Sequence, residues 1–431
     1  MSFIGVIADD LTGAMDAGMQ MLTANLTVHT ALLPQNLNQV RAGADVVVVN
    51  TQSRNIEPDA AYRAVKTAFQ NLQSAGCAGF YKKIDSTLRG NVGAELRAAL
   101  DSALFDMILV APALPFNKRT TRNGIHYVDG VPLAETELAQ DPFAPIQDSE
   151  ISRIIRTQYE TDTGLVALDD VHRGAERVSQ VMEEYAKAGI KLIIADAAAE
   201  QDLEVLAEAA GRLNRSVLLC GSAGLFQYFN RFYGEDLIRT ETQIKNQGLN
   251  GNGPVLVLSG SPAAASKRQI DRLRDHPDVC VIQLDITRLA EKQDAAARET
   301  AQKAVQSLRG GRHVILDAAG TSKAEIYRRA AGDRELLDRH SAMVLNLISE
   351  TAGAAALLPL AGLVIFGGDT AVAAAGRLGA AGIAIIGEVE PFIPLGRLIG
   401  GSRSGLPVVT KAGGFGSDEL LIRVLSILAG G

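Results

Sequence analysis

Short apolar runs rich in β-branched residues alternate along the first half of the chain with longer segments whose apolar residues recur at helical spacing. The short runs predict strands and the longer segments predict helices. The predicted strands are Phe3–Ala8, Asp45–Asn50, Phe80–Ile84, Met107–Val110, Lys191–Ala195 and Ser216–Leu219. The predicted helices are Leu11–Ala24, Asp59–Ala75 and Val92–Leu104, and the second buries Ala60, Val65, Ala68, Phe69 and Leu72 on one face. Alternating strands and helices are typical of crossover units, so a largely parallel sheet is expected.

The alternation stops between residues 239 and 253, where a stretch rich in Asn, Gln and Gly has no periodicity. Such a stretch predicts a linker. The strands predicted after it are Val255–Ser259, Val279–Leu284, His313–Asp317, Leu363–Phe366, Ile383–Ile386 and Pro407–Val409. The helices predicted after it are Ala263–Arg274, Asp294–Leu308, Thr370–Leu378 and Asp418–Leu428. The sequence therefore predicts two α/β domains with largely parallel sheets, 1–235 and 254–431, joined by a linker at 236–253.

Composition narrows the class of protein. The chain of 431 residues is 47% hydrophobic and 21% charged with a net charge of −7, which is an ordinary globular mix without the basic excess of a nucleic-acid binder. Its 3 cysteines lie far apart and suit a reducing compartment. Asp9, Asp10 and Asp16 interrupt any apolar signal sequence, and Pro359 breaks the uncharged stretch Thr351–Gly368. We expect a soluble cytoplasmic protein that binds a small molecule, with no nucleic acid or membrane as partner.

Open α/β sheets bind ligands at the carboxyl ends of their strands, so the informative segments lie where an apolar strand runs into polar residues or glycines. The first is Gly5–Ala14, where a strand delivers the adjacent carboxylates Asp9 and Asp10. Adjacent side chains point to different sides, so one can face a ligand while the other fixes the loop. The alternative is that Asp10 or Thr12 only caps the following helix. An aspartyl phosphatase pattern, Asp-x-Asp-x-Thr, fails here because Leu11 occupies the place of its second acid.

The second segment, Tyr81–Asn91, gathers two lysines, an aspartate, two hydroxyls and an arginine at one junction between a strand and a helix. Cations and hydroxyl donors at a helix start form an anion site. The alternative is a solvated loop with a capping Ser or Thr. Arg54 follows the strand that ends at Asn50 and is a second candidate cation for a carboxylate, although alone it would suit the surface equally.

The second half holds glycine loops at strand ends, which allow the backbone to approach a phosphate closely. They are Leu258–Pro262, Val364–Ala371 and Thr410–Ser417. Asp369 holds a metal or caps a helix, and Lys411 with its glycines forms a phosphate cradle or a mobile loop. Cys220–Gly224 has the same form and is equally explained as a tight turn. There is no P-loop, no G-x-G-x-x-G and no G-x-S-x-G motif.

Six motifs carry a resemblance to a known family. IADDLTGAMDAG, KKIDSTLRGNVGAE, CGSAGL, LSGS, FGGDTA and TKAGGFG occur in this order, and with them essentially the whole chain resembles the four-carbon acid sugar kinases. The resemblance implies ATP-dependent phosphorylation of threonate, erythronate or 3-oxo-tetronate. It also implies that the first domain binds the acid sugar and the second binds ATP, with both sites at a cleft between them. Leu11 resembles the threonate and erythronate kinases, since oxo-tetronate kinases more often carry Phe there.

The resemblance and the strand-end analysis together give the expected site residues. Those expected to bind the acid sugar are Asp9, Asp10, Arg54, Lys82, Lys83, Ile84, Asp85, Ser86 and Arg89. Those expected to bind ATP are Ser259, Ser261, Gly367, Gly368, Asp369, Thr370, Lys411, Gly413, Gly414, Phe415 and Gly416.

The expected roles follow from the chemistry of phosphoryl transfer. Arg54 and one of the two lysines, Lys82 or Lys83, hold the substrate carboxylate, because a guanidinium grips a carboxylate at two points. Asp10 or Asp85 orients the reacting hydroxyl and takes its proton, and Lys83 assists catalysis. Mg²⁺ bridges the phosphates with help from Asp369, and the two domains close to exclude water.

The favoured substrate is D-threonate, phosphorylated on its terminal hydroxyl to the 4-phosphate, with D-erythronate and 3-oxo-tetronate as other candidates. Two different functions are kept as alternatives. One is a phosphohydrolase acting on a small phosphorylated sugar acid, and the other is a sugar-acid sensor without catalysis. A homo-oligomer is left open.

Overall fold

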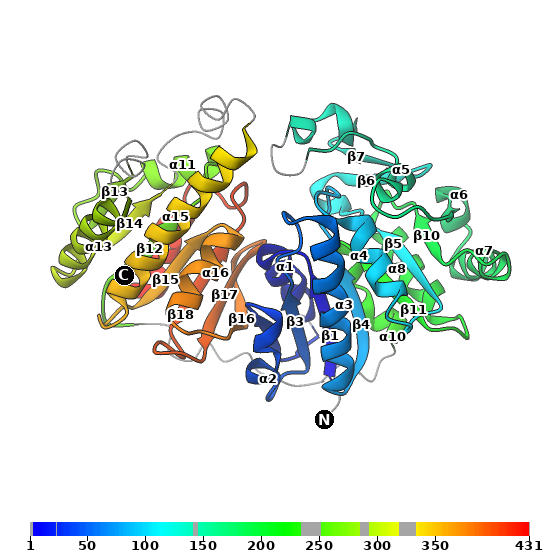
Figure 1. Cartoon of the computed structure of the whole chain (residues 1–431), viewed down its shortest axis with the longest axis horizontal. Coiled ribbons are helices and arrows are strands. Elements are labelled where there is room, and N and C mark those ends of the chain that lie inside the picture. Colours follow the sequence, from blue (N-terminus) through cyan, green and yellow to red (C-terminus); the bar gives the residue numbers. More distant parts are fainter. Residues whose placement is uncertain are drawn as a thin grey trace. The chain divides into compact units, whose positions relative to one another are not determined.

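The computed structural model describes residues 3–22, 24–140, 145–233, 251–284, 293–318 and 333–430. The chain divides into two compact units (Figure 1). The first comprises Met1–Val28 and Leu33–Thr242, and the second comprises His29–Leu32 and Gln243–Gly431. The second unit thus includes a short segment from the N-terminal half of the chain. A division of the chain at one linker cannot describe this arrangement. Most of the predicted linker, 236–250, lies outside the described residues.

The first unit is built on a parallel sheet with the strand order β3-β1-β4-β11-β5-β10-β9. Its strands are β1 (Phe3–Ala8), β3 (Val46–Asn50), β4 (Cys77–Lys83), β5 (Met107–Ala111), β9 (Thr163–Val166), β10 (Leu192–Ala195) and β11 (Val217–Gly221). Its longer helices are α1 (Leu11–Leu22), α3 (Pro58–Ser74), α4 (Val92–Leu100), α7 (Ala175–Lys187) and α8 (Glu200–Gly211). Its short helices are α2 (Leu37–Val40), α5 (Ile151–Arg156), α6 (Leu168–Val171), α9 (Ala223–Phe226) and α10 (Phe229–Tyr233). The parallel α/β architecture is confirmed.

Helix α3 shows how the apolar pattern selects the buried face. Val65, Ala68, Phe69 and Leu72 are buried as predicted, but the fifth buried residue is Ala61, whereas Ala60 is partly exposed. The prediction of Ala60 is wrong because Ala61 lies four residues before Val65, and residues four apart share one helix face.

A small antiparallel sheet was not predicted from the sequence. It contains β6 (Arg119–Arg122), β7 (Ile125–Val128) and β8 (Val131–Pro132), which pair in order. Both of its turns consist of residues with positive φ, at Asn123-Gly124 and at Asp129-Gly130. Asn-Gly and Asp-Gly are the preferred residues of tight hairpin turns, because both central positions of such turns need φ above zero.

The second unit has a mixed sheet with the order β13-β14-β12-β15-β18-β17-β16. The five strands before β17 in this order are parallel, and β18, β17 and β16 pair antiparallel. The strands are β12 (Val255–Ser259), β13 (Val279–Gln283), β14 (His313–Asp317), β15 (Gly362–Phe366), β16 (Gly382–Glu390), β17 (Ile393–Ile399) and β18 (Pro407–Lys411). The helices are α11 (Ala264–Asp271), α13 (Gln293–Arg309), α15 (Arg334–Ala355), α16 (Gly368–Arg377) and α17 (Leu420–Ala429). Strand β2 (Val28–Ala31) lies almost wholly in the segment that joins this unit.

The uncharged stretch Thr351–Gly368 divides as its Pro and Gly residues predict. Its first part ends α15 at Ala355, and its later part forms the fully buried strand β15. Strand β15 contributes Val364 and Phe366 to the core of the second unit. Within the ranges of the chain that are described, no helix is both long and apolar enough to span a bilayer.

Candidate functional site

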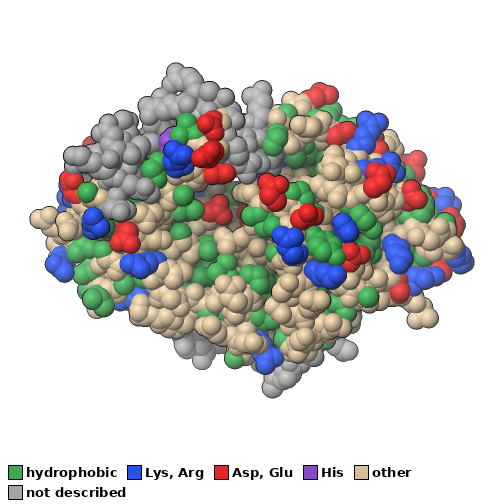
Figure 2. All heavy atoms as spheres, in the orientation of Figure 1, with side chains coloured by type: hydrophobic (Ala, Val, Ile, Leu, Met, Phe, Trp, Pro, Cys, Tyr) green, Lys and Arg blue, Asp and Glu red, His purple; other side chains and the backbone are tan. Residues whose placement is uncertain are grey.

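Buried charges, rather than a surface patch of one sign, mark the candidate site. On the face shown in Figure 2, acidic and basic side chains are interspersed. In the first unit, however, Asp9, Lys82, Lys83, Asp85 and Glu95 are all less than a tenth exposed. Charged side chains are rarely buried unless they are paired, and they gather at functional sites. Most of them stand at the carboxyl ends of β1 and β4, where the topology of the sheet predicts a ligand.

Arg54 links the two carboxylates that follow β1. Its Nε donates to Asp9 Oδ2 at 2.7 Å, and its Nη1 and Nη2 donate to Asp10 Oδ2 and Oδ1, both at 2.8 Å. Asp10 Oδ1 also accepts from the Gly13 N–H at 2.7 Å at the start of α1, so it caps the helix as well as binding Arg54. Burial raises the pKa of Asp10. Burial acts in the same direction on Asp9, but nearby cations, chiefly Arg54, outweigh it and lower the pKa of Asp9.

Asp85, just beyond β4, is the third carboxylate of the cluster. Its Oδ2 accepts from Thr87 Oγ1 and from Arg89 Nε, each at 2.6 Å, and its Oδ1 lies 3.9 Å from Arg54 Nη2. Burial opposes ionisation, yet Arg89 and Arg54 outweigh it and hold the pKa of Asp85 well below its usual range. Asp85 therefore carries a full negative charge that its own loop neutralises.

The two lysines at the end of β4 have different surroundings. Lys82 Nζ lies 2.6 Å from Glu95 Oε2 and donates to the Lys83 carbonyl at 2.8 Å. Glu95 Oε1 in turn accepts from Ser53 Oγ at 2.5 Å, and neither the Lys82 nor the Glu95 side chain is more than 1% exposed. Burial raises the pKa of Glu95. Lys82 thus anchors α4 to the sheet.

Lys83 instead lies beside the aspartate cluster. Its Nζ donates to the Ile84 carbonyl at 2.8 Å. A Cβ atom placed on Gly13 would lie 3.0 Å from Lys83 Nζ and 2.7 Å from Asp10 Oδ1, so the glycine lets both groups approach α1. Of the two lysines expected to bind substrate, only Lys83 stands next to Asp10.

The unpredicted β6–β7 hairpin supplies two further residues to this cluster. Arg119 Nη1 donates to Ser86 Oγ, and His126 Nε2 lies 2.8 Å from the Ser86 carbonyl. Burial lowers the pKa of His126 to about 4, so the ring is neutral at pH 7 and Nε2 is the donor to that carbonyl. His126 Nδ1 then accepts from Thr121 Oγ1 at 3.0 Å. The turn residues Asn-Gly and Asp-Gly were the sequence signal that could have located this hairpin.

Asp16 is a third residue that the sequence did not single out as part of the site. It lies on α1, is partly exposed, and its carboxyl interacts electrostatically with Lys83, Asp10, Arg54 and Arg119. Burial raises the pKa of Asp16 to about 7, with Asp10 acting in the same direction and Lys83 against it. Asp16 falls within the motif IADDLTGAMDAG, but its place on an amphipathic helix does not by itself distinguish it from a surface charge.

In the second unit the predicted glycine loops meet at one edge of the sheet. Strands β12, β15 and β18 are parallel neighbours, so their carboxyl ends are adjacent. A Cβ on Gly260 would contact Thr370 Oγ1, and one on Gly413 would contact Ser261 Oγ. Ser259 Oγ is buried and has no hydrogen-bond partner among the described residues. Asp317, which sequence analysis did not select, lies beside Ser259 in the register of β14 and β12.

The loop after β18, Thr410–Ser417, is held in place by buried polar side chains. Lys411 Nζ donates to Ser266 Oγ at 3.0 Å and to the Gly413 carbonyl at 2.9 Å, and it lies 4.4 Å from the centre of the Phe366 ring. Burial lowers the pKa of Lys411 to about 7. Gln269 Nε2 donates to the carbonyls of Phe415, Gly416 and Ser417 at 3.2, 3.1 and 2.9 Å.

Asp369 is an exposed carboxylate in the first turn of α16. No group of three or more His, Cys, Asp or Glu side chains able to hold a metal ion occurs in the described part of the chain. An ion held mainly by phosphates and water needs only one or two protein carboxylates, and Asp369 can supply one.

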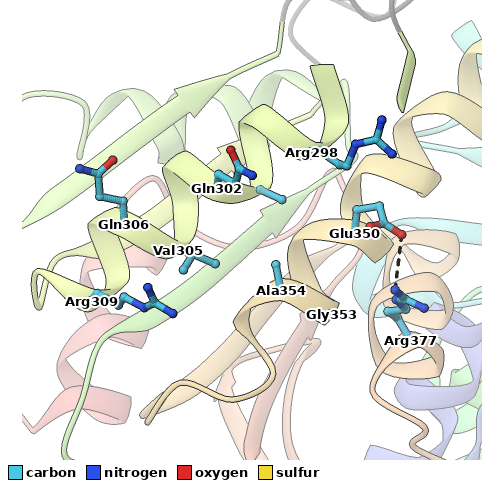
Figure 3. Close-up of a pocket in the computed structure, with 10 residues that line it drawn as sticks. Arg298, Gln302, Val305, Gln306, Arg309, Glu350, Gly353, Ala354 and Arg377 are labelled. Carbon is cyan, nitrogen blue, oxygen red and sulfur yellow. Dashed lines mark ion pairs between the residues drawn. The ribbon is translucent and has the colours of Figure 1, made fainter. Parts of the chain in front are cut away.

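A separate hollow of about 660 Å³ lies between α13, α15 and α16 (Figure 3). Arg298, Arg309 and Arg377 line it, and Arg377 Nη2 lies 3.5 Å from Glu350 Oε1. None of the predicted site residues lines this hollow.

The sequence matches two family models that together cover most of the chain. Residues 4–229 match a sugar-binding N-terminal domain, and residues 256–421 match a nucleotide-binding C-terminal domain. The chain is 36% identical to a D-threonate kinase from Salmonella typhimurium over 97% of both chains. It is 29% identical to a D-erythronate kinase from Heliobacterium modesticaldum, over 97% of this chain and 95% of that one.

The fold has relatives of known structure. A crystal structure of a Haemophilus influenzae protein is 27% identical and superposes with a TM-score of 0.73 over 97% of this chain and 98% of that one. The expected kinase class is confirmed by these matches along the full length. The chain is therefore an enzyme that phosphorylates a hydroxyl group, and it belongs to the four-carbon acid sugar kinase family.

Proposed function

We propose that this enzyme transfers the γ-phosphoryl group of ATP to the terminal hydroxyl of D-threonate and releases the 4-phosphate. The observation that carries the proposal is the buried charge cluster of the first unit, in which Arg54 joins Asp9, Asp10 and Asp85 beside Lys83. A small hydroxy acid has one carboxylate and several hydroxyls, and it needs cations and hydrogen-bond acceptors within the same small volume. Full-length similarity to a D-threonate kinase supports the choice of acid.

In this proposal Lys83 binds the carboxylate of the substrate, and the aspartates accept hydrogen bonds from the hydroxyls of the substrate. Lys83 is favoured over Lys82 because the Lys82 ammonium is paired with Glu95 and fully buried. Arg54 orders the aspartates, since its Nε and both terminal nitrogens already donate to Asp9 and Asp10. Ile84, Ser86 and Arg89 complete the loop that closes around the acid.

The loops of the second unit bind ATP in this proposal. Ser259, Ser261 and Gly413–Gly416 lie at the strand ends, and the amino end of α16 carries Gly367, Gly368, Asp369 and Thr370. A helix start offers free N–H groups and partial positive charge to phosphate oxygens. Asp369 would hold Mg²⁺, which neutralises phosphate charge when bound. Lys411 supports the loop through Gly413 and gains charge when phosphate is near.

An ADP-release assay with ATP and Mg²⁺ tests the proposed function directly. We expect turnover with D-threonate at the highest kcat/KM in a panel of D- and L-threonate, D- and L-erythronate and 3-oxo-tetronate. A higher kcat/KM with another acid would change the substrate that we assign but would still show that the enzyme is a kinase. Phosphate release from a phosphorylated sugar acid without nucleotide would indicate a phosphohydrolase. Binding of the acid without turnover would indicate a sensor.

Replacing Gly413 by alanine should raise the KM for ATP about tenfold and leave the KM for the acid within about twofold. The added Cβ would contact Ser261 Oγ, so the loop or the serine must move. Gly387→Ala on β16, outside the loops proposed to bind ATP, is the matched control, because a Cβ there meets no atom within 4 Å. Both constants are measured by steady-state kinetics. Equal effects of the two variants would contradict the loop assignment.

A further inference from the structure

Helix α1 places Asp16 on the same side as the close approach at Gly13. Residues three apart in a helix lie on one face, one turn from each other. At Gly13 that face meets Asp10 Oδ1 and Lys83 Nζ, with Arg54 Nη2 3.8 Å from the position of a Cβ. The Asp16 carboxyl, one turn further on, is therefore next to the cluster proposed to bind the acid sugar, and it interacts with Lys83, Asp10, Arg54 and Arg119.

The other carboxylates of the cluster are held by cations, although only one oxygen of Asp9 is bonded: its Oδ2 accepts from Arg54, and its Oδ1 is buried with no hydrogen-bond partner among the described residues. Both oxygens of Asp10 accept from the Arg54 guanidinium, and Oδ1 accepts from the Gly13 N–H as well. Asp85 Oδ2 accepts from Thr87 and Arg89. A neighbouring guanidinium lowers the proton affinity of a carboxylate, and the pKa values of Asp9 and Asp85 are lowered. Burial raises the pKa of Asp10, but a proton there would have to displace a bond from Arg54. The Asp16 carboxyl, by contrast, has no hydrogen bond or ion pair to any residue that the structure describes.

We propose that Asp16 is the catalytic residue that accepts the proton of the acid-sugar hydroxyl as that hydroxyl is phosphorylated. This inference rests on the proposed function. The hydroxyl oxygen forms a bond to the γ-phosphorus while the bond from that phosphorus to the bridging oxygen of ADP breaks. The electron pair leaves with ADP, and the hydroxyl proton moves to Asp16.

The surroundings of Asp16 suit this role. A general base is most effective when its proton affinity matches the working pH. With a pKa of about 7, Asp16 is ionised in a large fraction of molecules and still binds a proton well. The charged groups that act on it electrostatically are Lys83 on β4, Asp10 before α1, Arg54 after β3 and Arg119 on β6.

The experiment compares wild type, Asp16→Asn and Asp16→Glu in the ADP-release assay from pH 5.5 to 9. We expect wild-type kcat to fall on the acid side with a midpoint near pH 7. Asp16→Asn should lose that limb and lower kcat by about 100-fold or more, while acid binding measured by calorimetry stays within about threefold. Asp16→Glu should have a higher kcat than Asp16→Asn, and its kcat should again fall on the acid side of the pH profile.

Folding is checked by thermal unfolding at pH 5 and pH 8. Because the pKa of Asp16 in the folded protein lies above its ordinary value of 3.8, the wild type loses stability as pH rises from about 4 to 7. Asp16→Asn should therefore be at least as stable as wild type at pH 8, so lost activity would not reflect unfolding.

Two results would overturn the inference while leaving the kinase intact. One is an Asp16→Asn variant with kcat within about threefold of wild type and an unchanged acid limb. The other is a raised KM for the acid with unchanged kcat, which would make Asp16 a binding residue only. A wild-type enzyme that forms no ADP with any acid contradicts the proposed function itself, and that is seen before any variant is made.

Discussion

Replacing Arg54 by alanine should lower kcat/KM for the acid sugar by about 100-fold and leave the KM for ATP within about twofold. The guanidinium bonds Asp9 and Asp10 and lies 3.9 Å from Asp85, so its loss leaves three carboxylates in one small volume without their shared cation. Mutual repulsion would then raise their pKa values and disfavour an anionic substrate. Steady-state kinetics with each substrate varied in turn measures both constants.

Two variants sharpen that test. Arg54→Lys keeps the charge but cannot reach Asp9 and both oxygens of Asp10, so it should recover only a small part of the activity. Arg215→Ala is the matched control, because Arg215 makes a comparable two-point contact with Glu183 at 2.8 Å on the surface. It should leave turnover unchanged. A rise in the KM for ATP upon Arg54→Ala would show that the two units have the opposite roles.

Replacing Lys82 by methionine should lower the free energy of unfolding by about 3–5 kcal/mol. The change leaves Glu95 buried without the ammonium that lies 2.6 Å from it. Because β4 pairs with β1 and β11, the strain falls on the middle of the sheet. Urea unfolding followed by tyrosine fluorescence reports on this unit, because the chain has no tryptophan and the tyrosines of its described part all belong to the first unit.

The double variant Lys82→Met/Glu95→Gln separates lost pairing from lost packing. Glutamine removes the unpaired charge and keeps an acceptor for Ser53, so more than half of the lost stability should return. Arg212→Met, which breaks the exposed contact of Arg212 with Glu208, is the control and should have little effect. A double variant no more stable than Lys82→Met would show that the buried charge is not the cause.

Strand ends could be predicted from the sequence because two physical signals coincide there. An apolar β-branched run such as Val255–Ser259 or His313–Asp317 can only be a buried strand when glycine or polar residues bound it, and both are found with these bounds. Parallel strands place their carboxyl ends at one edge, so Asp10, Arg54 and Lys83 could be expected to meet.

The partners of those residues could not be predicted from the same signals. Adjacent lysines on a strand point to opposite sides, but only the packing of α4 shows that Lys82 meets Glu95 and Lys83 does not. Arg119 and His126 reach the site on a hairpin that the alternation of strands and helices does not predict, although its Asn-Gly and Asp-Gly turns are visible in the sequence. Asp16 could be assigned to the site only from the close approach of other residues to Gly13, and these residues come from segments that are distant in sequence.

The charged residues of the cluster in the first unit are held in place by one another, and this has an evolutionary consequence. Burying ionised groups opposes folding, whereas holding them in place favours catalysis, because the site need not reorganise during the reaction. Natural enzymes commonly show this conflict between stability and activity. Selection for heat resistance alone would therefore favour neutral residues at positions such as Asp16, and the most stable descendants of this enzyme would be its slowest.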